Sequence, residues 1–189
     1  MELLGTNEIV SVEEYLSGEL VAEIKHEYLG GIVHAMTGGK VRHSKAAVNI
    51  CRFLGNALEG KPCQPFSSDM KVRIELPEQT RFYYPDAMVV CDSLDDDSTY
   101  QDKPVVVIEV LSESTKRVDM GEKRDAYRAV STLRALLLVD PERPYVTVDR
   151  RRENGGFDTE FYTDMGEVIP LAEISAELRM DSIYSGMEI

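Results

Sequence analysis

The sequence predicts one domain of mixed α/β class. Three observations predict it. The length of 189 residues suits a single domain with a full core. Short runs of β-branched residues alternate with segments of helical periodicity. No repeat or Gly/Ser/Pro-rich linker divides the chain, so we expect residues 1–189 to form one unit.

The N-terminal part is predicted to hold two helices separated by a hairpin. Residues 11–24 have the pattern of a short amphipathic helix, opened by Ser11 and Glu14 as a capping box. Residues 26–39 have the pattern of a hairpin that turns at Gly30 and Gly31. Residues 42–59 then carry apolar side chains on one helical face.

The middle of the chain predicts a three-stranded meander, a helix and a fourth strand. The strands are expected at residues 70–76, 84–91 and 104–111, and the fourth at 133–140. The helix is expected at residues 119–130, with Asp119 as its N-cap. Three short antiparallel strands at 145–171 form a C-terminal β extension, and residues 174–184 are expected to form a small helix.

The composition is that of a soluble globular protein. Apolar residues make up 43% of the chain and charged residues 29%. No apolar run is long enough to cross a bilayer and the N-terminus lacks the apolar core of a signal peptide, so we expect a cytoplasmic protein without membrane contact. Cys51, Cys63 and Cys91 are odd in number and scattered, which predicts buried reduced thiols.

The formal net charge of −13 argues against broad electrostatic binding to nucleic acid, which normally needs a basic surface. It does not exclude a nuclease, because bound divalent cations and a local basic cluster reverse the sign of charge within one cleft. Basic residues do cluster within residues 40–45, 116–124 and 150–152.

A carboxylate interrupts the most apolar strand, where Glu109 follows four β-branched residues. Such a group is costly to bury unless it is paired. We expect this strand and the preceding one to form an antiparallel hairpin around the polar loop between them. If the hairpin is centred on the middle of that loop, Asp86 lies opposite Glu109. Two facing carboxylates repel, and a divalent cation of the Mg²⁺ type relieves that repulsion. A structural role stays open, in which Glu109 accepts backbone N–H bonds or pairs with Lys123 or Arg124.

A polar stripe is expected on the helix that follows Glu109. Asp119, Lys123 and Tyr127 are spaced at i, i+4 and i+8 and therefore share one face. We expect this face to begin near the carboxylates, where Lys123 would act as a cation beside a water or a phosphate. The alternative is a surface ion pair between Lys123 and Asp119, of little consequence.

These segments, in this order, resemble the PD-(D/E)XK superfamily of restriction-endonuclease-like proteins and, more narrowly, the bacterial Uma-two family, which is grouped with endonucleases. The resemblance rests on "YYPDAMVVCD", "KPVVVIEVLSEST", the D-x-x-x-K-x-x-x-Y helix and "LLLVDP", and it extends to the hairpin "HEYLGGIVHAMTGG" and the helix "RHSKAAVNICRFLGNAL". It covers nearly the whole chain. It implies a central mixed β-sheet flanked by helices, with an αβββαβ core, and a phosphodiesterase site that uses Mg²⁺ or Mn²⁺.

The resemblance also implies roles for particular residues. Asp86 and Glu109 correspond to the two acids of the superfamily, and the backbone carbonyl of Val110 would join them on the metal. Leu111 stands where the superfamily normally has its lysine, and Lys123 matches the lysine proposed to replace it in the narrower family. Three further residues match family positions: Glu27 as a third carboxylate, His43 as a phosphate or water contact, and Asp69 as a lesser candidate along the neighbouring strand.

We therefore expect a metal-dependent endonuclease that acts on DNA, as a homodimer. One alternative is a nuclease-fold interaction module that no longer cuts, which the missing in-strand lysine and the negative charge favour. Another is a phosphodiesterase that uses the same site on RNA or small nucleotides.

Overall fold

The computed structural model describes residues 9–92, 95–112 and 121–189. In chain order the elements are α1 (Val12–Glu19), β1 (His26–Leu29), β2 (Ile32–Ala35), α2 (Val41–Leu58), β3 (Gln64–Ser67), β4 (Lys71–Leu76), β5 (Gln79–Tyr83), β6 (Ala87–Val90), β7 (Tyr100–Gln101), β8 (Pro104–Val110), α4 (Glu122–Ala129), β9 (Ala135–Asp140), β10 (Tyr145–Arg151), β11 (Phe157–Tyr162), β12 (Val168–Leu171), η1 (Ala172–Ile174), β13 (Ala176–Arg179) and α5 (Met180–Ile183).

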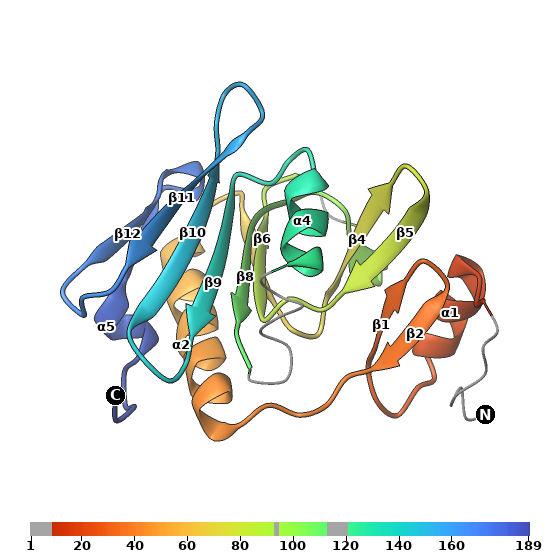
Figure 1. Ribbon diagram of the computed structural model, residues 1–189, viewed down its shortest axis with the longest axis horizontal. Helices are drawn as coiled ribbons and strands as arrows, with labels where there is room; N and C mark the ends of the chain where they lie inside the picture. The colour runs from red at the N-terminus through yellow and green to blue at the C-terminus, as the bar shows by residue number, and fades with distance from the viewer. Residues whose placement is uncertain (1–8, 93–94, 113–120) are drawn as a thin grey trace.

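The larger sheet has six strands in the order β11-β10-β9-β8-β6-β3. It is mixed, because β8 and β9 run parallel while β6 and β8 run antiparallel, as do β9 and β10. The connection from β8 to β9 contains α4, as a parallel crossover requires. In Figure 1, α4 lies in front of this sheet and α2 and α5 lie behind it. The predicted mixed α/β fold, a sheet flanked by helices, is confirmed.

The predicted meander is wrong, because β4 belongs to a second sheet with the order β2-β1-β5-β4-β7. The chain turns back directly after β4, so that β4 pairs with β5 and Val72 faces Tyr83. The partners of β6 are β3 and β8. Both β3 and β5 are short strands without a clear alternation of apolar and polar residues, and the sequence pattern did not reveal them.

Side chains of the larger sheet alternate between two hydrophobic cores. On β8, Ile108 and Val110 pack with residues of α2 and α5, whereas Val107 packs with residues of α4, β4 and β5. Successive residues of a strand point to opposite faces. Glu109 therefore shares the face of Val107 and projects toward α4, which is packed between the two sheets.

The helices and hairpins match the sequence patterns to different extents. The capping box of Ser11 and Glu14 is present, although α1 ends at Glu19. The hairpin turns at Gly30 and Gly31, whose φ angles of 59° and 105° favour glycine. The predicted C-terminal helix is wrong in part, because residues 176–179 pair with β12 before the short α5. Within the described ranges, no helix is both long and apolar enough to cross a bilayer.

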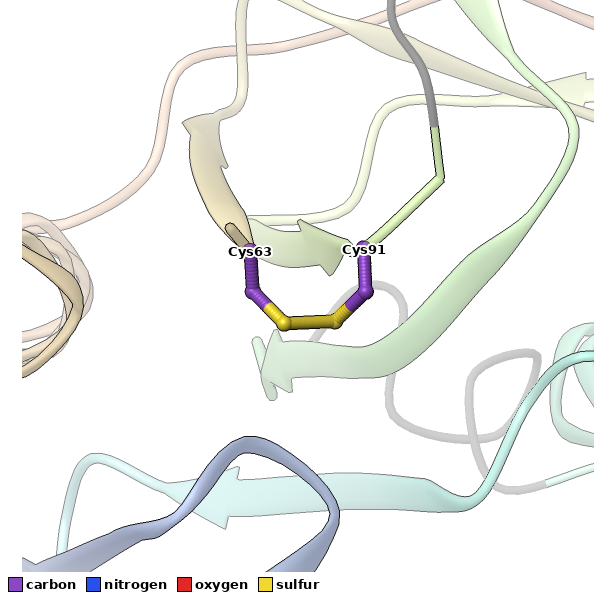
Figure 2. Close-up of a disulfide and its surroundings, with 2 residues drawn as sticks. All are labelled: Cys63 and Cys91. Atoms are coloured by element: carbon purple, nitrogen blue, oxygen red, sulfur yellow. A yellow bond between two sulfur atoms is a disulfide. The ribbon is translucent and has the colours of Figure 1, made fainter. Parts of the chain in front are cut away.

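The expectation of three reduced thiols is wrong, since Cys63 and Cys91 form a disulfide, which Figure 2 shows. Cys63 directly precedes β3 and Cys91 directly follows β6. Gln64 pairs with Val90 between these strands, so the two cysteines occupy the next facing position, with Cα atoms 4.0 Å apart. Without β3, the sequence pattern gave no reason to bring them together. Cys51 on α2 is a free thiol.

Candidate active site

The start of β6 and the end of β8 open onto a cavity of about 720 Å³. Walls come from both sheets, from α4 and from the β2–α2 linker. Six of the residues predicted for the site line it: Glu27, His43, Asp86, Glu109, Val110 and Lys123.

The two acids meet in the register that the sequence predicted. Ala87 pairs with Ile108 and Met88 pairs with Val107, so the next facing pair along the strands is Asp86 and Glu109. Asp86 lies just before β6. Its Oδ2 accepts a hydrogen bond of 2.7 Å from the backbone N–H of Val110. This bond fixes the Asp86 carboxylate beside the end of β8.

Two residues of α4 explain why Glu109 is tolerated in a buried strand. Its side chain is 6% exposed, and its Oε1 lies 2.9 Å from Nζ of Lys123. The same oxygen accepts a hydrogen bond of 2.6 Å from the hydroxyl of Tyr127. Burial, and then the neighbouring Glu109, hold the pKa of Tyr127 well above its usual range, so this hydroxyl remains a donor. Tyr127 itself does not line the cavity.

Lys123 connects the acids of the two sheets. Its Nζ lies 2.9 Å from Oε1 of Glu27 on β1, as well as against Glu109 on β8. It also lies over the ring of Tyr83, 5.1 Å from the ring centre. The Lys123 side chain is only 7% exposed. Its described interactions are thus those of a buried cation, whereas Asp119, the partner in the alternative ion pair, lies outside the described residues.

His43 in the first turn of α2 also contacts Asp86. Its Nε2 lies 3.3 Å from Oδ2 of Asp86. The hydrogen bond to Asp86 raises the pKa of His43 above its ordinary value of 6.5, although burial acts in the opposite direction. Asp86 is therefore held by one main-chain and one imidazole contact.

The backbone of Gly39 makes room for this imidazole. A Cβ atom at Gly39 would lie 2.9 Å from Nδ1 of His43, whereas a Cβ at Gly38 would meet nothing within 4 Å. We expect Gly39→Ala to displace the ring from Asp86 and lower the pKa of His43 toward 6.5. Gly38→Ala is the matched control and should leave that pKa raised. An NMR titration of the three histidines measures it, and an equal pKa in both variants would contradict the steric argument.

Of the remaining predicted residues, one lies away from the site and one cannot be placed. Asp69 lies in the turn before β4 with its side chain 85% exposed, and it forms an ion pair with Lys25. Because β4 pairs with β5, Asp69 is not carried along a strand that faces Asp86. Asp119 lies outside the described residues, and the N-cap of α4 is Gly121.

Three acids of the cavity wall, Glu122, Asp140 and Glu142, were missed in the sequence, and of these Asp140 is the buried one. Asp140 ends β9, and Val139 before it pairs with Val110 in the parallel ladder, so β8 and β9 end at the same edge of the sheet. Oδ1 of Asp140 accepts a hydrogen bond of 3.0 Å from the backbone N–H of Glu142, and Oδ2 lies 3.2 Å from Arg143. The sequence did contain a signal for Asp140, because it is the last residue of an apolar strand and a proline follows it directly.

The donor set of this cavity fits a hard divalent cation. Among the described residues, no three His, Cys, Asp or Glu side chains are arranged as a ready-made metal site. Mg²⁺, however, is usually bound by one or two carboxylates, with water and substrate phosphates completing its ligands. Asp86 and Glu109 supply such carboxylates from adjacent strands, and both line the cavity.

Three comparisons bear on the chain as a whole. Residues 12–181 match the model of the Uma2 family, which is described as "Putative restriction endonuclease". The uncharacterized protein slr1290 of Synechocystis sp. is 32% identical, over 94% of this chain and 93% of its own length. The uncharacterized protein sll1609 of the same organism is 29% identical, over 74% of this chain and 80% of its own.

A solved structure shares the fold. The crystal structure of a protein described as a putative nuclease belonging to DUF820, from Anabaena variabilis, aligns with a TM-score of 0.73. The alignment covers 93% of this chain and 98% of that one, at 15% sequence identity. At this identity the likeness shows a shared fold and carries no statement about chemistry.

Proposed function

Because the chain belongs to the Uma2 family, described as putative restriction endonucleases, we propose that it is a metal-dependent endonuclease that hydrolyses phosphodiester bonds of DNA. The observation that carries the proposal is the position of Asp86 and Glu109 one step beyond the Ala87–Ile108 pair of the β6–β8 ladder, with Lys123 against Glu109. Carboxylates and a cation that converge on one cavity are the groups that phosphodiester hydrolysis needs.

Asp86 and Glu109 would hold Mg²⁺ or Mn²⁺, with the backbone carbonyl of Val110 and with Glu27 as further oxygen ligands. Such a cation, when bound, lowers the pKa of a water and neutralises charge that develops on the phosphoryl oxygens. The hydrogen bond from Val110 N–H and the contact with His43 orient Asp86 toward the cavity. The hydroxyl of Tyr127 orients Glu109 from the buried side.

Lys123 takes the role that the superfamily assigns to an in-strand lysine. Leu111 occupies that in-strand position, and its side chain packs in the core with α4. Lys123 reaches Glu109 from the helix instead, within 2.9 Å. A cation there stabilises the non-bridging oxygens of a phosphate or positions the attacking water. This contact counters the argument that the missing in-strand lysine makes the protein a non-catalytic interaction module.

The test is a cleavage assay with the purified full chain. Supercoiled, linear and single-stranded DNA and a structured RNA are incubated at low salt with Mg²⁺, Mn²⁺ or EDTA. We expect cleavage of DNA that requires the divalent cation and stops in EDTA. Cleavage of RNA alone would move the substrate to RNA. No cleavage, together with no Mn²⁺ binding by calorimetry, would favour the interaction module.

We expect Lys123→Met to reduce the cleavage rate by about a hundredfold, because the cation beside Glu109 is lost while the aliphatic length is kept. The assay is the same, with thermal melting to verify that the variant is folded. Lys61→Met is a suitable control, since Lys61 donates to the backbone of Ser175 at an exposed site that does not line the cavity. Unchanged cleavage by the folded Lys123 variant would exclude Lys123 from the mechanism.

A further inference from the structure

A second cavity of about 860 Å³ adjoins the first. Both cavities are lined by the β2–α2 linker at residues 36–39, and both include His43, Tyr84 and Asp86. They therefore meet at one of the two acids of the active site. A chain-like ligand that occupies the second cavity would pass directly to Asp86.

The two cavities differ in charge. The first has six lining acids and two lysines: Glu27, Asp86, Glu109, Glu122, Asp140 and Glu142, with Lys40 and Lys123. In the second, Asp86 is the one carboxylate among the described residues that line it, and it is accompanied by Lys25 and Arg52. Hydroxyl groups of Ser44, Ser67 and Ser68 also line this second cavity. Cations and hydroxyls are the groups that bind phosphate oxygens.

We propose that the second cavity binds the phosphodiester backbone of the nucleic-acid strand on one side of the phosphate that is cut, through Lys25 and Arg52. The proposal rests on the proposed nuclease function and names how its substrate is held. A net charge of −13 repels nucleic acid from most of the surface, so binding must come from local cations. Lys25 and Arg52 are such cations, next to the site.

Lys25 is placed to exchange its present partner for a phosphate. Its side chain is 39% exposed, and its Nζ donates to the backbone oxygen of Ser68 at 2.9 Å and forms an ion pair with the exposed Asp69. Surface pairs of this kind contribute little and are easily exchanged. Asp69 thus competes with phosphate for Lys25.

Arg52 lies on the exposed face of α2. Its Nη2 donates to Oδ1 of Asn49 at 3.2 Å, and with respect to the described residues its other guanidinium N–H groups remain for a ligand.

The experiment measures binding without cleavage. The full chain is titrated against fluorescein-labelled single-stranded and duplex DNA in EDTA, at several salt concentrations, by fluorescence anisotropy. EDTA makes the result independent of the metal. The variants are Lys25→Gln with Arg52→Gln, Asp69→Asn, and Lys103→Gln as the control. Lys103 forms an exposed ion pair with Asp92 at the end of β8 remote from Glu109.

We expect the double variant to raise Kd about tenfold and to reduce the slope of log Kd against log salt by about two, one for each lost phosphate contact. Asp69→Asn should lower Kd several-fold, an effect that a merely structural pair would not give. Lys103→Gln should change Kd by less than the double variant or Asp69→Asn does.

Two outcomes overturn the proposal. If the double variant binds as wild type does, the second cavity is not the binding site, and metal-dependent cleavage by wild type would still support the nuclease. If the wild-type protein binds neither single-stranded nor duplex DNA and also fails to cleave DNA, both the proposed binding site and the proposed function are wrong.

Discussion

Glu109→Gln will reduce metal-dependent cleavage by about a thousandfold or more, which corresponds to about 4 kcal/mol of transition-state stabilisation. Glutamine keeps the size of the side chain and an oxygen that accepts from Tyr127, whereas the charge that would hold the cation is gone. The measurement is the cleavage rate at saturating Mg²⁺ and, separately, Mn²⁺ binding by calorimetry. Both should be lost together, because one carboxylate serves both.

The matched control is Glu142→Gln, the same chemical change in the same cavity. Glu142 lines the cavity wall with its side chain 52% exposed, 3.5 Å from Nε of Arg42. We expect a change of less than about tenfold there, since an exposed pair of this kind is weak. A Glu109→Gln protein that melts as wild type does and still cleaves at the wild-type rate would remove Glu109 from the site.

The second expected result concerns stability, at a carboxylate remote from the cavity. Asp149 on β10 is fully buried, and it accepts hydrogen bonds from Arg124 Nε at 2.6 Å, Arg128 Nε at 3.0 Å and Thr159 Oγ1 at 2.8 Å. Both arginines belong to α4, the helix that carries Lys123 and Tyr127. Asp149 therefore anchors that helix to the larger sheet.

Asp149→Ala should lower the free energy of unfolding by about 3 kcal/mol, because it leaves two partly buried guanidinium groups without their common anion. Urea denaturation measures the change. Asp158→Ala is the control, since Asp158 is 66% exposed and lies 3.6 Å from Arg152, and we expect less than about 0.5 kcal/mol there. A loss of similar size in both variants would refute the anchoring role.

The same residue predicts a dependence on pH. Burial acts to raise the pKa of Asp149, but hydrogen bonds from Arg124, Arg128 and Thr159 outweigh it and hold the pKa below its ordinary value of 3.8. A carboxyl with a depressed pKa stabilises the folded state above its unfolded pKa, and that stability is lost as pH falls through the folded pKa. The difference between wild type and Asp149→Ala should thus be complete at neutral pH and shrink only below about pH 3.8.

The local part of the site was predictable from the sequence because it depends on two simple periodicities. The constant register of an antiparallel pair set Asp86 opposite Glu109, and β6 and β8 adopt that register. The helical spacing placed Lys123 and Tyr127 on one face, and both contact Glu109. These relations involve neighbouring elements and need no knowledge of the whole fold.

The non-local part was not predictable in this way. Glu27 reaches Lys123 only because the hairpin of β1 and β2 joins β5 in a separate sheet, and β5 was not recognised. His43 reaches Asp86 only because α2 begins at the cavity, after the β2–α2 linker. For both residues the sequence offered a family resemblance and no physical argument, since no periodicity relates one sheet to another.

The bond between Cys63 and Cys91 divides the chain topologically as well as holding two strands together. Residues 63–91 form a covalent macrocycle that contains β3 to β6 and Asp86, whereas Glu109 and Lys123 belong to the open chain beyond it. After a single proteolytic cut within the macrocycle, the disulfide would still hold the two pieces together as one molecule. Its mass would increase only by that of one water. The N-terminal fragment, which carries Glu27, and the C-terminal fragment, which carries Glu109, would separate on a denaturing gel only after reduction.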